Sequence, residues 1–235
     1  MFSVVTPVFN QSTFTYQYLS DMHNSIPEGN EVIVVDNGST DNTQDVLKTW
    51  AANMRPKLIV IHNEKNLGFS VASNQGYAAS RGDKVIFLNN DIKTKHSFWH
   101  KRLLENIKDN NIISPSGGYV DEKTFAFKYE TQSSYDKINY LSGWCLAGKR
   151  DTFEKMKKDL GQETGPFIEE FITYFEDTYM GFQCKRLGIE MKVISPVDIV
   201  HFGKMTSRTM NISEMYLTAK AKFTKKILEE RGQNG

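Results

Sequence analysis

The 235-residue sequence has few cysteines, no excess of either charge and no long hydrophobic run. Lysine and arginine together number 29, and aspartate and glutamate number 28, so the chain has no strong overall field that would attract nucleic acid or an acidic membrane. Its two cysteines, Cys145 and Cys184, form no CxxC pair, which argues against a structural zinc site. We expect both to be reduced thiols in a cytoplasmic protein.

The sequence also lacks the patterns of a membrane span or a secretory signal. Its apolar runs are far shorter than the roughly 20 residues that a transmembrane helix needs. The first ten residues have no positively charged region and contain Pro7, so we interpret them as a strand and not as a signal peptide. The protein is therefore expected in the cytoplasm, with peripheral contact at the inner membrane face as the alternative.

What the sequence does contain is a repeated order of apolar strand, turn and helix. The expected strands are 2–8, 31–35, 57–62 and 84–88, and the expected helices are 12–25, 41–53 and 68–80. Three such units in a row predict a parallel sheet with right-handed crossovers. We therefore predict a single α/β domain with a mostly parallel sheet and helices on both faces.

The second half of the sequence is less regular. A polar, glycine-containing stretch at 114–140 predicts a loop or hairpin region, where specificity is often determined. The other expected helices are 96–108, 167–187 and 211–231, and the other expected strands are 140–148, 191–194 and 199–202. The last helix has an apolar stripe at helical spacing, formed by Met215, Ala219, Phe223 and Ile227.

Two of the predicted strands end in polar residues. Asp36 follows the strand at 31–35, and Asn89, Asn90 and Asp91 follow the strand at 84–88. The carboxyl ends of parallel strands meet at one edge of a sheet, where open α/β proteins bind ligands. Carboxylate and amide oxygens suit Mn²⁺ or Mg²⁺. The pattern favours a nucleotide at one end of this edge and a metal-bound diphosphate at the other.

Six motifs occur in a fixed order along the chain. They are SVVTPVFN (3–10), VVDNGSTDNT (34–43), NLGFSVASNQG (66–76), FLNND (87–91), FEDTYMGFQCKRLG (175–188) and HFGKMTS (201–207). Together they resemble a family 2 glycosyltransferase of the GT-A fold, close to the rhamnosyltransferase-like branch. The resemblance implies an inverting enzyme that moves a sugar from a nucleoside diphosphate sugar, UDP- or dTDP-linked, to an acceptor hydroxyl on a glycan, a protein or a lipid-linked molecule.

The resemblance assigns donor binding to residues of the first three motifs. The Asp36 carboxylate would accept the imide N–H of uracil or thymine, because a carboxylate only accepts hydrogen bonds. The structural alternative for Asp36 is stabilisation by the dipole of the next helix. Thr6 and Pro7 lie at the end of the first predicted strand and would line the same base pocket, and Gly68 permits close approach of the backbone to a phosphate. The resemblance places Asn66 and Asn74 beside the nucleotide.

The predicted metal site lies in the fourth and sixth motifs. Asn89, Asn90 and Asp91 occupy the place of the family's DxD motif, with Asn89 where the first Asp is expected, which removes one negative charge. The resemblance makes Asp91 and His201 the metal ligands, and neutral imidazole is an acceptable ligand beside oxygens. Two cations in the same segment would neutralise the diphosphate or lie on the solvated surface: Lys204 and Arg208.

The catalytic base is expected in the fifth motif. The resemblance makes Asp177 the group that deprotonates the acceptor hydroxyl, with Glu176 as its neighbour. Aromatic residues precede this pair, and an apolar environment raises the pKa of a carboxyl and makes it a stronger base. Stabilisation by the helix dipole is the structural alternative. The motif LSGWC would line the acceptor pocket through Gly143 and Trp144, whose ring could stack on a sugar.

These assignments divide the domain into parts. We expect 1–95 to form the nucleotide-sugar-binding half, 96–210 to form the acceptor-binding and catalytic half, and 211–235 to form a C-terminal amphipathic helix with a frayed tail. Two alternatives stay open. One is a nucleotide-sugar- or glycan-binding module without catalysis, and the other is a sugar nucleotidyltransferase, which would want a glycine-rich basic loop after the first strand. We expect no nucleic acid partner, and the sequence leaves the oligomeric state open.

Overall fold

The computed structural model describes residues 1–172, 174–203 and 212–233. Strands and helices alternate through the first part of the chain, as predicted. They are β1 (Phe2–Val8), α1 (Ser12–Ser25), β2 (Glu31–Asp36), α2 (Thr43–Ala51), β3 (Lys57–His62), α3 (Phe69–Ala79) and β4 (Lys84–Leu88).

The second part contains eight strands and four helices within the described ranges. In chain order these are β5 (Ile92–Thr94), α4 (Trp99–Asn106), β6 (Asn111–Ser114), β7 (Gly117–Val120), β8 (Phe127–Thr131), β9 (Tyr140–Leu141), β10 (Cys145–Lys149), α5 (Arg150–Asp159), α6 (Glu176–Leu187), β11 (Glu190–Val193), β12 (Ile199–His201) and α7 (Ile212–Gln233). Of the helices in the described ranges, α5 has no counterpart among the predicted elements.

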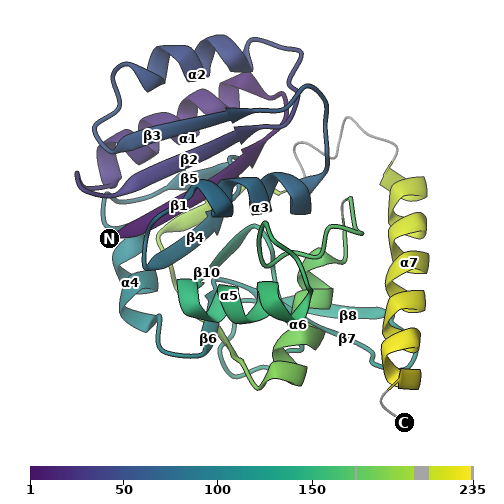
Figure 1. Cartoon of the computed structure of the whole chain (residues 1–235). Helices are drawn as coiled ribbons and strands as arrows, with labels where there is room; N and C mark the ends of the chain where they lie inside the picture. The colour runs from purple at the N-terminus through teal and green to yellow at the C-terminus, as the bar shows by residue number, and fades with distance from the viewer. Residues whose placement is uncertain (173, 204–211, 234–235) are drawn as a thin grey trace.

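A seven-stranded sheet in the order β11-β6-β10-β4-β1-β2-β3 forms the centre of the domain (Figure 1). The strands β4, β1, β2 and β3 are parallel to one another, and β10 runs antiparallel to both β4 and β6. The register pairs Pro7 with Val35 and Asp36 with His62, so the carboxyl ends of these strands lie along one edge. The prediction of a mostly parallel sheet is confirmed.

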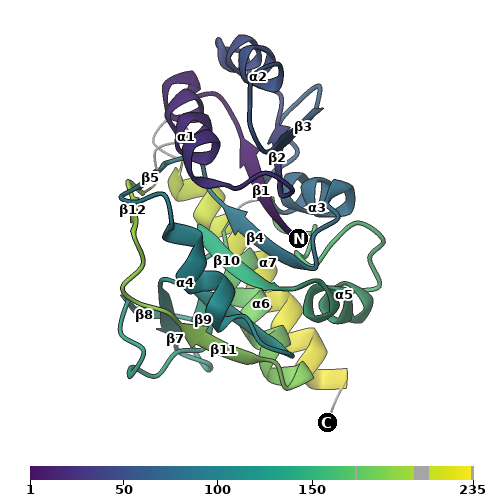
Figure 2. The ribbon, with the colours of Figure 1, turned by 90° about the vertical axis from the view of Figure 1, so that its left-hand side faces the viewer.

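Helices cover both faces of this sheet. Successive residues of a strand point to opposite faces, so the continuous apolar runs of the central strands need a covering layer on each side. In β4, Ile86 belongs to the core beneath α1, α2 and α4, and Phe87 belongs to the core beneath α3, α5 and α6. The last four residues of β4 are buried, which explains the continuous apolar sequence of this strand. Figures 1 and 2 show the two helical layers on either side of the sheet.

Two smaller sheets carry the less regular second part. The polar region predicted as a loop or hairpin forms a three-stranded sheet in the order β8-β7-β9, and β12 pairs with β5. The strand predicted at 140–148 is divided into β9 and β10. The chain turns at residues 142–144, so that β9 joins the small sheet and β10 joins the large one.

The helix predicted from 167 to 187 begins only at Glu176. Tyr174 and Phe175 have left-handed backbone conformations, with φ of 65° and 67°, which an α-helix of L-residues does not accommodate. Residues 167–172 instead form an irregular segment of turns and bends. The prediction of a continuous helix was therefore wrong over its first part.

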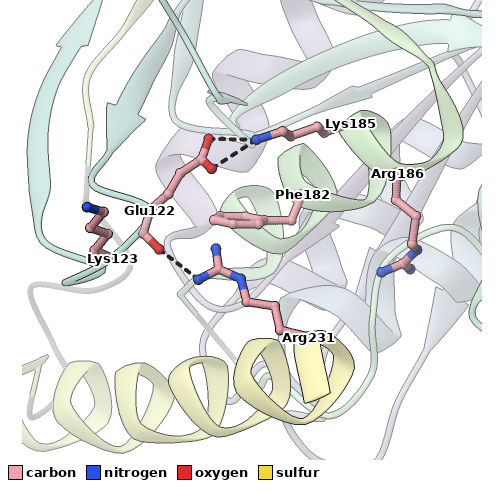
Figure 3. A pocket seen from close by; sticks show the side chains of 6 residues that line it. All are labelled: Glu122, Lys123, Phe182, Lys185, Arg186 and Arg231. Carbon is pink, nitrogen blue, oxygen red and sulfur yellow. Dashed lines mark hydrogen bonds and ion pairs between the residues drawn. The ribbon is translucent and has the colours of Figure 1, made fainter. Parts of the chain in front are cut away.

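The C-terminal helix α7 lies along α6 and the small sheet (Figures 1 and 2). Its stripe residues Ala219, Phe223 and Ile227 are buried among aromatic side chains, as the periodicity predicts. On the outside of this junction, Figure 3 shows a groove in which Lys185 binds the carboxylate of Glu122 and Arg231 donates to the Glu122 carbonyl oxygen. Over the residues that the structure describes, no helix combines the length and apolarity that a bilayer span requires.

Candidate active site

A cavity of about 430 Å³ lies at the carboxyl ends of β1 and β4. Its other walls come from the starts of α3 and α6, the turn between β9 and β10, and β12. The cavity gathers most of the predicted site residues from across the sequence. These are Pro7, Asn66, Gly68, Asn89, Asn90, Asp91, Gly143, Trp144, Glu176, Asp177 and His201.

Asp91 and His201 meet at one end of this cavity. The antiparallel pairing of β12 with β5 places His201 opposite Ile92, and the Phe202 N–H binds the Asp91 carbonyl oxygen. The His201 Nε2 atom then lies 3.1 Å from Asp91 Oδ1, although the two residues are 110 positions apart. The indole of Trp144 stacks on the imidazole, with ring centroids 4.7 Å apart and planes 8° apart. Strand pairing and stacking together fix the imidazole against the carboxylate.

This pair fits a divalent cation. Two adjacent ligands of an octahedral ion, each about 2.1 Å from the metal, lie about 3 Å apart, close to the separation of Asp91 and His201. An oxygen and an imidazole nitrogen are both suitable for Mn²⁺ or Mg²⁺. Within 1–172, 174–203 and 212–233, no cluster of three or more His, Cys, Asp and Glu side chains is found that could hold an ion by itself. Diphosphate oxygens and water would complete such a site.

Asn89 and Asn90 have different places at this edge. Asn89 is half-buried at the cavity wall, and its N–H binds the Trp144 carbonyl oxygen. The Asn90 side chain donates to Thr15 Oγ1 at 3.0 Å, which anchors the turn to α1. Asn90 therefore contributes to the structure of the turn as well as to the wall. Lys204 and Arg208, predicted near the diphosphate, lie outside the described residues.

The acidic pair Glu176 and Asp177 lies on another wall, at the first turn of α6. The Asp177 Oδ2 atom accepts the Gly143 N–H at 3.1 Å, and Oδ1 accepts the Thr178 N–H at 2.6 Å and the Thr178 hydroxyl at 3.2 Å. A Cβ atom at Gly143 would lie 3.3 Å from Asp177 Cβ, so the turn passes very close to the carboxylate. These contacts hold the carboxylate in one orientation.

The two carboxyls differ in their environment. Burial, followed by the negative charge of Asp177, raises the pKa of Glu176 to about 8. Its Oε2 atom is buried and has no hydrogen-bond partner among the described residues. Burial also raises the pKa of Asp177, but hydrogen bonds from Gly143 and Thr178 oppose this effect. Glu176 therefore holds its proton far more readily than an exposed glutamate does, and the hydrogen bonds to Asp177 favour the ionised form of that carboxyl.

The third wall is the loop that leads into α3. Asn37, which is buried, donates through Nδ2 to Asn66 Oδ1 at 2.9 Å and to the Gly68 carbonyl at 3.1 Å, and its Oδ1 accepts the Leu67 N–H at 3.0 Å. Gly68 has φ of 90° and lies directly against the Ile172 carbonyl. Asn37 was not among the predicted site residues, although its position directly after Asp36 at a strand end is a signal that could have identified it.

Three predicted donor-site residues do not line the cavity. Asp36 is fully buried, and its oxygens accept the Ser39 N–H at 3.0 Å and lie 3.2 Å from His62 Nδ1. Thr6 is also fully buried, with its hydroxyl 2.5 Å from that of Tyr18.

The third of these residues, Asn74, faces the irregular segment before α6. It donates to the Phe167 carbonyl at 2.8 Å and to Glu169 at 2.9 Å, and it accepts the Phe167 N–H at 3.0 Å. Neither Asn74 nor its partners Phe167 and Glu169 are among the residues that line the cavity. The side chains of Thr6 and Asn74 thus bind other parts of the protein in this structure, and their places beside the nucleotide stay predictions.

The fold and the site together define a protein of the GT-A glycosyltransferase class. Residues 3–185 match the model of glycosyl transferase family 2, and the chain belongs to this family. It is 29% identical over 169 residues to the uncharacterized glycosyltransferase YfnE of Bacillus subtilis, covering 72% of this chain and 42% of the relative. It is 26% identical over 177 residues to glycosyltransferase AglE of Haloferax volcanii, covering 73% and 57%. The chain thus spans about half the length of these curated relatives.

Solved structures show the same fold. The mannosyltransferase PcManGT from Pyrobaculum calidifontis, in complex with GDP-Man and Mn²⁺, superposes with a TM-score of 0.61 at 18% identity over 84% of this chain and 55% of that chain. The S. aureus TarS 1-349 structure in complex with UDP superposes with a TM-score of 0.62 at 21% identity over 84% and 59%.

Proposed function

We propose that the chain is a metal-dependent inverting glycosyltransferase that moves a sugar from a nucleoside diphosphate sugar to an acceptor hydroxyl. The observation that carries this proposal is one cavity with two chemically distinct ends. Asp91 and His201 lie 3.1 Å apart at one end, and the Glu176–Asp177 pair lines the same cavity. Membership of family 2 supports glycosyl transfer as the reaction.

The donor would lie with its diphosphate near Asp91 and His201 and its nucleoside toward Pro7, Asn66 and Gly68. The solved complexes of PcManGT with GDP-Man and of TarS with UDP support a nucleotide sugar as the donor. The choice of UDP or dTDP, like the rhamnosyltransferase-like branch, rests on the motif resemblance. Base recognition by Asp36 stays a prediction, and it would require that buried carboxylate to release His62 or Ser39.

A divalent cation, Mn²⁺ or Mg²⁺, would be held by Asp91 and His201. When bound, such an ion supplies positive charge that stabilises a leaving diphosphate. Trp144 keeps the imidazole in place by stacking, and the amide of Asn89 provides a neutral oxygen where a second carboxylate would otherwise stand. The protein thus contributes one negative charge through Asp91 at this end of the cavity.

The base of the reaction would be Asp177. Its carboxylate, oriented by three donated hydrogen bonds that favour the ionised form, takes the proton of the acceptor hydroxyl while that oxygen bonds to the anomeric carbon. The bond between the anomeric carbon and the diphosphate breaks in the same step, and nucleoside diphosphate leaves. A single displacement of this kind inverts the anomeric configuration. Glu176 holds its own proton and so avoids a second charge beside the base.

The residues that line the cavity also support different roles for different parts of the chain. Residues 1–95 supply the donor side, and 96–210 supply Gly143, Trp144 and the base, with 211–235 as a covering helix and tail. One face of Trp144 is taken by His201, so only its other face could stack on an acceptor sugar. Gly143 acts through its N–H, which orients Asp177.

The test is the Asp177→Asn variant, assayed with UDP-, dTDP- and GDP-sugars, Mn²⁺ and a panel of acceptors. We expect transfer to fall by about 10²- to 10⁴-fold. The matched control is Asp136→Asn, because that carboxylate bonds to Thr131 on the hairpin and does not line the cavity. Undiminished transfer by Asp177→Asn would remove Asp177 as the base. Release of pyrophosphate would instead favour a nucleotidyltransferase, and donor binding without turnover would favour a binding module.

A further inference from the structure

A fourth carboxylate, Glu130, lines the same cavity as Asp91, Glu176 and Asp177. It comes from β8 of the three-stranded sheet, in the region that the sequence identifies only as a loop or hairpin. The mechanism proposed above uses the other three and gives Glu130 no role.

Glu130 is held in place before any ligand binds. Its Oε1 atom accepts the Ser142 hydroxyl at 2.6 Å and the Ser116 hydroxyl at 3.1 Å. No hydrogen bond to its Oε2 atom is found among the described residues. Each oxygen of an ionised carboxylate can accept two hydrogen bonds. The side chain is thus fixed through one oxygen and keeps the other for a ligand.

The two serines connect Glu130 to both reactive ends of the cavity. Ser116 also accepts the Trp144 Nε1–H at 2.9 Å, and Trp144 stacks on His201. Ser142 directly precedes Gly143, whose N–H holds Asp177. A ligand group bound by Glu130 would therefore be placed relative to the metal pair and the base by a continuous set of contacts.

The charges around Glu130 restrict what can bind there. The negative charge of Glu130 helps to raise the pKa of Asp177 and of Tyr140, which shows that the three groups lie within electrostatic reach of one another. No lysine or arginine lines the cavity within the described part of the chain. A phosphate or carboxylate on the acceptor would be repelled here, whereas hydroxyl groups would donate to the free carboxylate oxygen.

We infer that Glu130 binds the acceptor, through a hydroxyl other than the attacking one, and that the reacting end of the acceptor is an uncharged polyhydroxylated sugar. This inference rests on the proposed function, in which Asp177 is the base. It names the acceptor class of that reaction, and it places the choice of acceptor on the hairpin sheet.

The experiment compares neutral and anionic acceptor probes. The probes are p-nitrophenyl glucoside, galactoside and N-acetylglucosaminide, together with p-nitrophenyl glucuronide, which carries a carboxylate. We expect the wild-type chain to use a neutral glycoside at least about tenfold better, in kcat/KM, than the glucuronide. In the Glu130→Gln variant the acceptor KM should rise by about 10- to 100-fold, as expected for the loss of a hydrogen bond to a charged group. The donor KM should change far less, and the preference against the glucuronide should narrow.

Two controls keep the result interpretable. The glutamine amide oxygen can still accept both serine hydroxyls, so Glu130→Gln is expected to fold, and an unchanged melting temperature checks this. Asp136→Asn, on the same hairpin, should leave the acceptor KM unchanged. An unchanged acceptor KM in Glu130→Gln, or wild-type use of the glucuronide but of no neutral glycoside, overturns the inference. Failure of the proposed function is distinguishable, because it would appear as no nucleoside diphosphate release from any donor.

Discussion

Replacing Gly68 by alanine tests the close contact between the loop that leads into α3 and the segment that leads into α6. A Cβ atom at Gly68 would lie 2.3 Å from the Ile172 carbonyl oxygen and 2.9 Å from the carbonyl carbon and Cα of the same residue. These are backbone atoms, and Ile172 is further fixed because its oxygen accepts the Phe69 N–H at 2.8 Å. The segment cannot yield by turning a side chain, so either α3 or the approach to α6 must move.

The expected loss of stability has two parts. The backbone at Gly68, with φ of 90° and ψ of 166°, is in a region that non-glycine residues reach only at a cost of about 1–3 kcal/mol. Forcing an extra methyl group into a packed contact costs about 1–3 kcal/mol more. The free energy of unfolding should therefore fall by about 2–6 kcal/mol. At about 2–4 °C per kcal/mol for a chain of this size, the melting temperature should fall by roughly 4–24 °C.

Thermal unfolding of Gly68→Ala and of a control, Gly188→Ala, is the measurement. Gly188 is also left-handed, with φ of 64°, but nothing lies within 4 Å of the position of a Cβ atom. The control should lose only the backbone part, about 1–2 kcal/mol. Transfer activity of Gly68→Ala should also fall, because residues 172–175 lead directly into Glu176 and Asp177. Equal losses of stability in the two variants would refute the contact with Ile172 as a structural constraint.

Two further predictions concern pH and metal. Because the pKa of Glu176 is raised to about 8 in the folded chain, this carboxyl destabilises the fold when it ionises, so stability should fall as pH rises through that value. Glu176→Gln should show a smaller fall in melting temperature from about pH 5 to about pH 9, and an unchanged fall would contradict the assignment. EDTA should abolish transfer and Mn²⁺ restore it, and His201→Ala should bind Mn²⁺ about tenfold or more weakly by calorimetry. Equal Mn²⁺ affinity in that variant would remove His201 from the metal site.

The parallel part of the fold was predictable from local sequence. The strands at 2–8, 57–62 and 84–88 were predicted with their observed bounds, because buried apolar runs end at turn residues within the same short stretch. The juxtaposition of His201 with Asp91 was expected only through the resemblance to a known family. No local pattern indicates that β12 pairs with β5, since this depends on the whole fold.

Other features could not be read from the sequence. The left-handed residues before α6 are Tyr174 and Phe175, which carry no glycine signal, so an aromatic-rich stretch was interpreted as helix. Asn74 lies in a helix of small and apolar residues that gives no indication of which side faces the cavity. Glu130 acquires its position through Ser116 and Ser142, which are distant in the chain, and its hairpin has no periodic pattern.

The separation of the two sheets has a consequence for how such a protein can change. The strands β8, β7 and β9 share no hydrogen-bonded ladder with the large sheet, and the chain passes between the sheets at the turn of Ser142–Trp144. Residues 127–137, none of which is buried, could therefore be exchanged for a segment of different shape and charge without opening the core that Val120 and Phe125 share with α6 and α7. Such a change would alter the part of the cavity wall that carries Glu130, while Asp91, His201 and Asp177 would keep their positions.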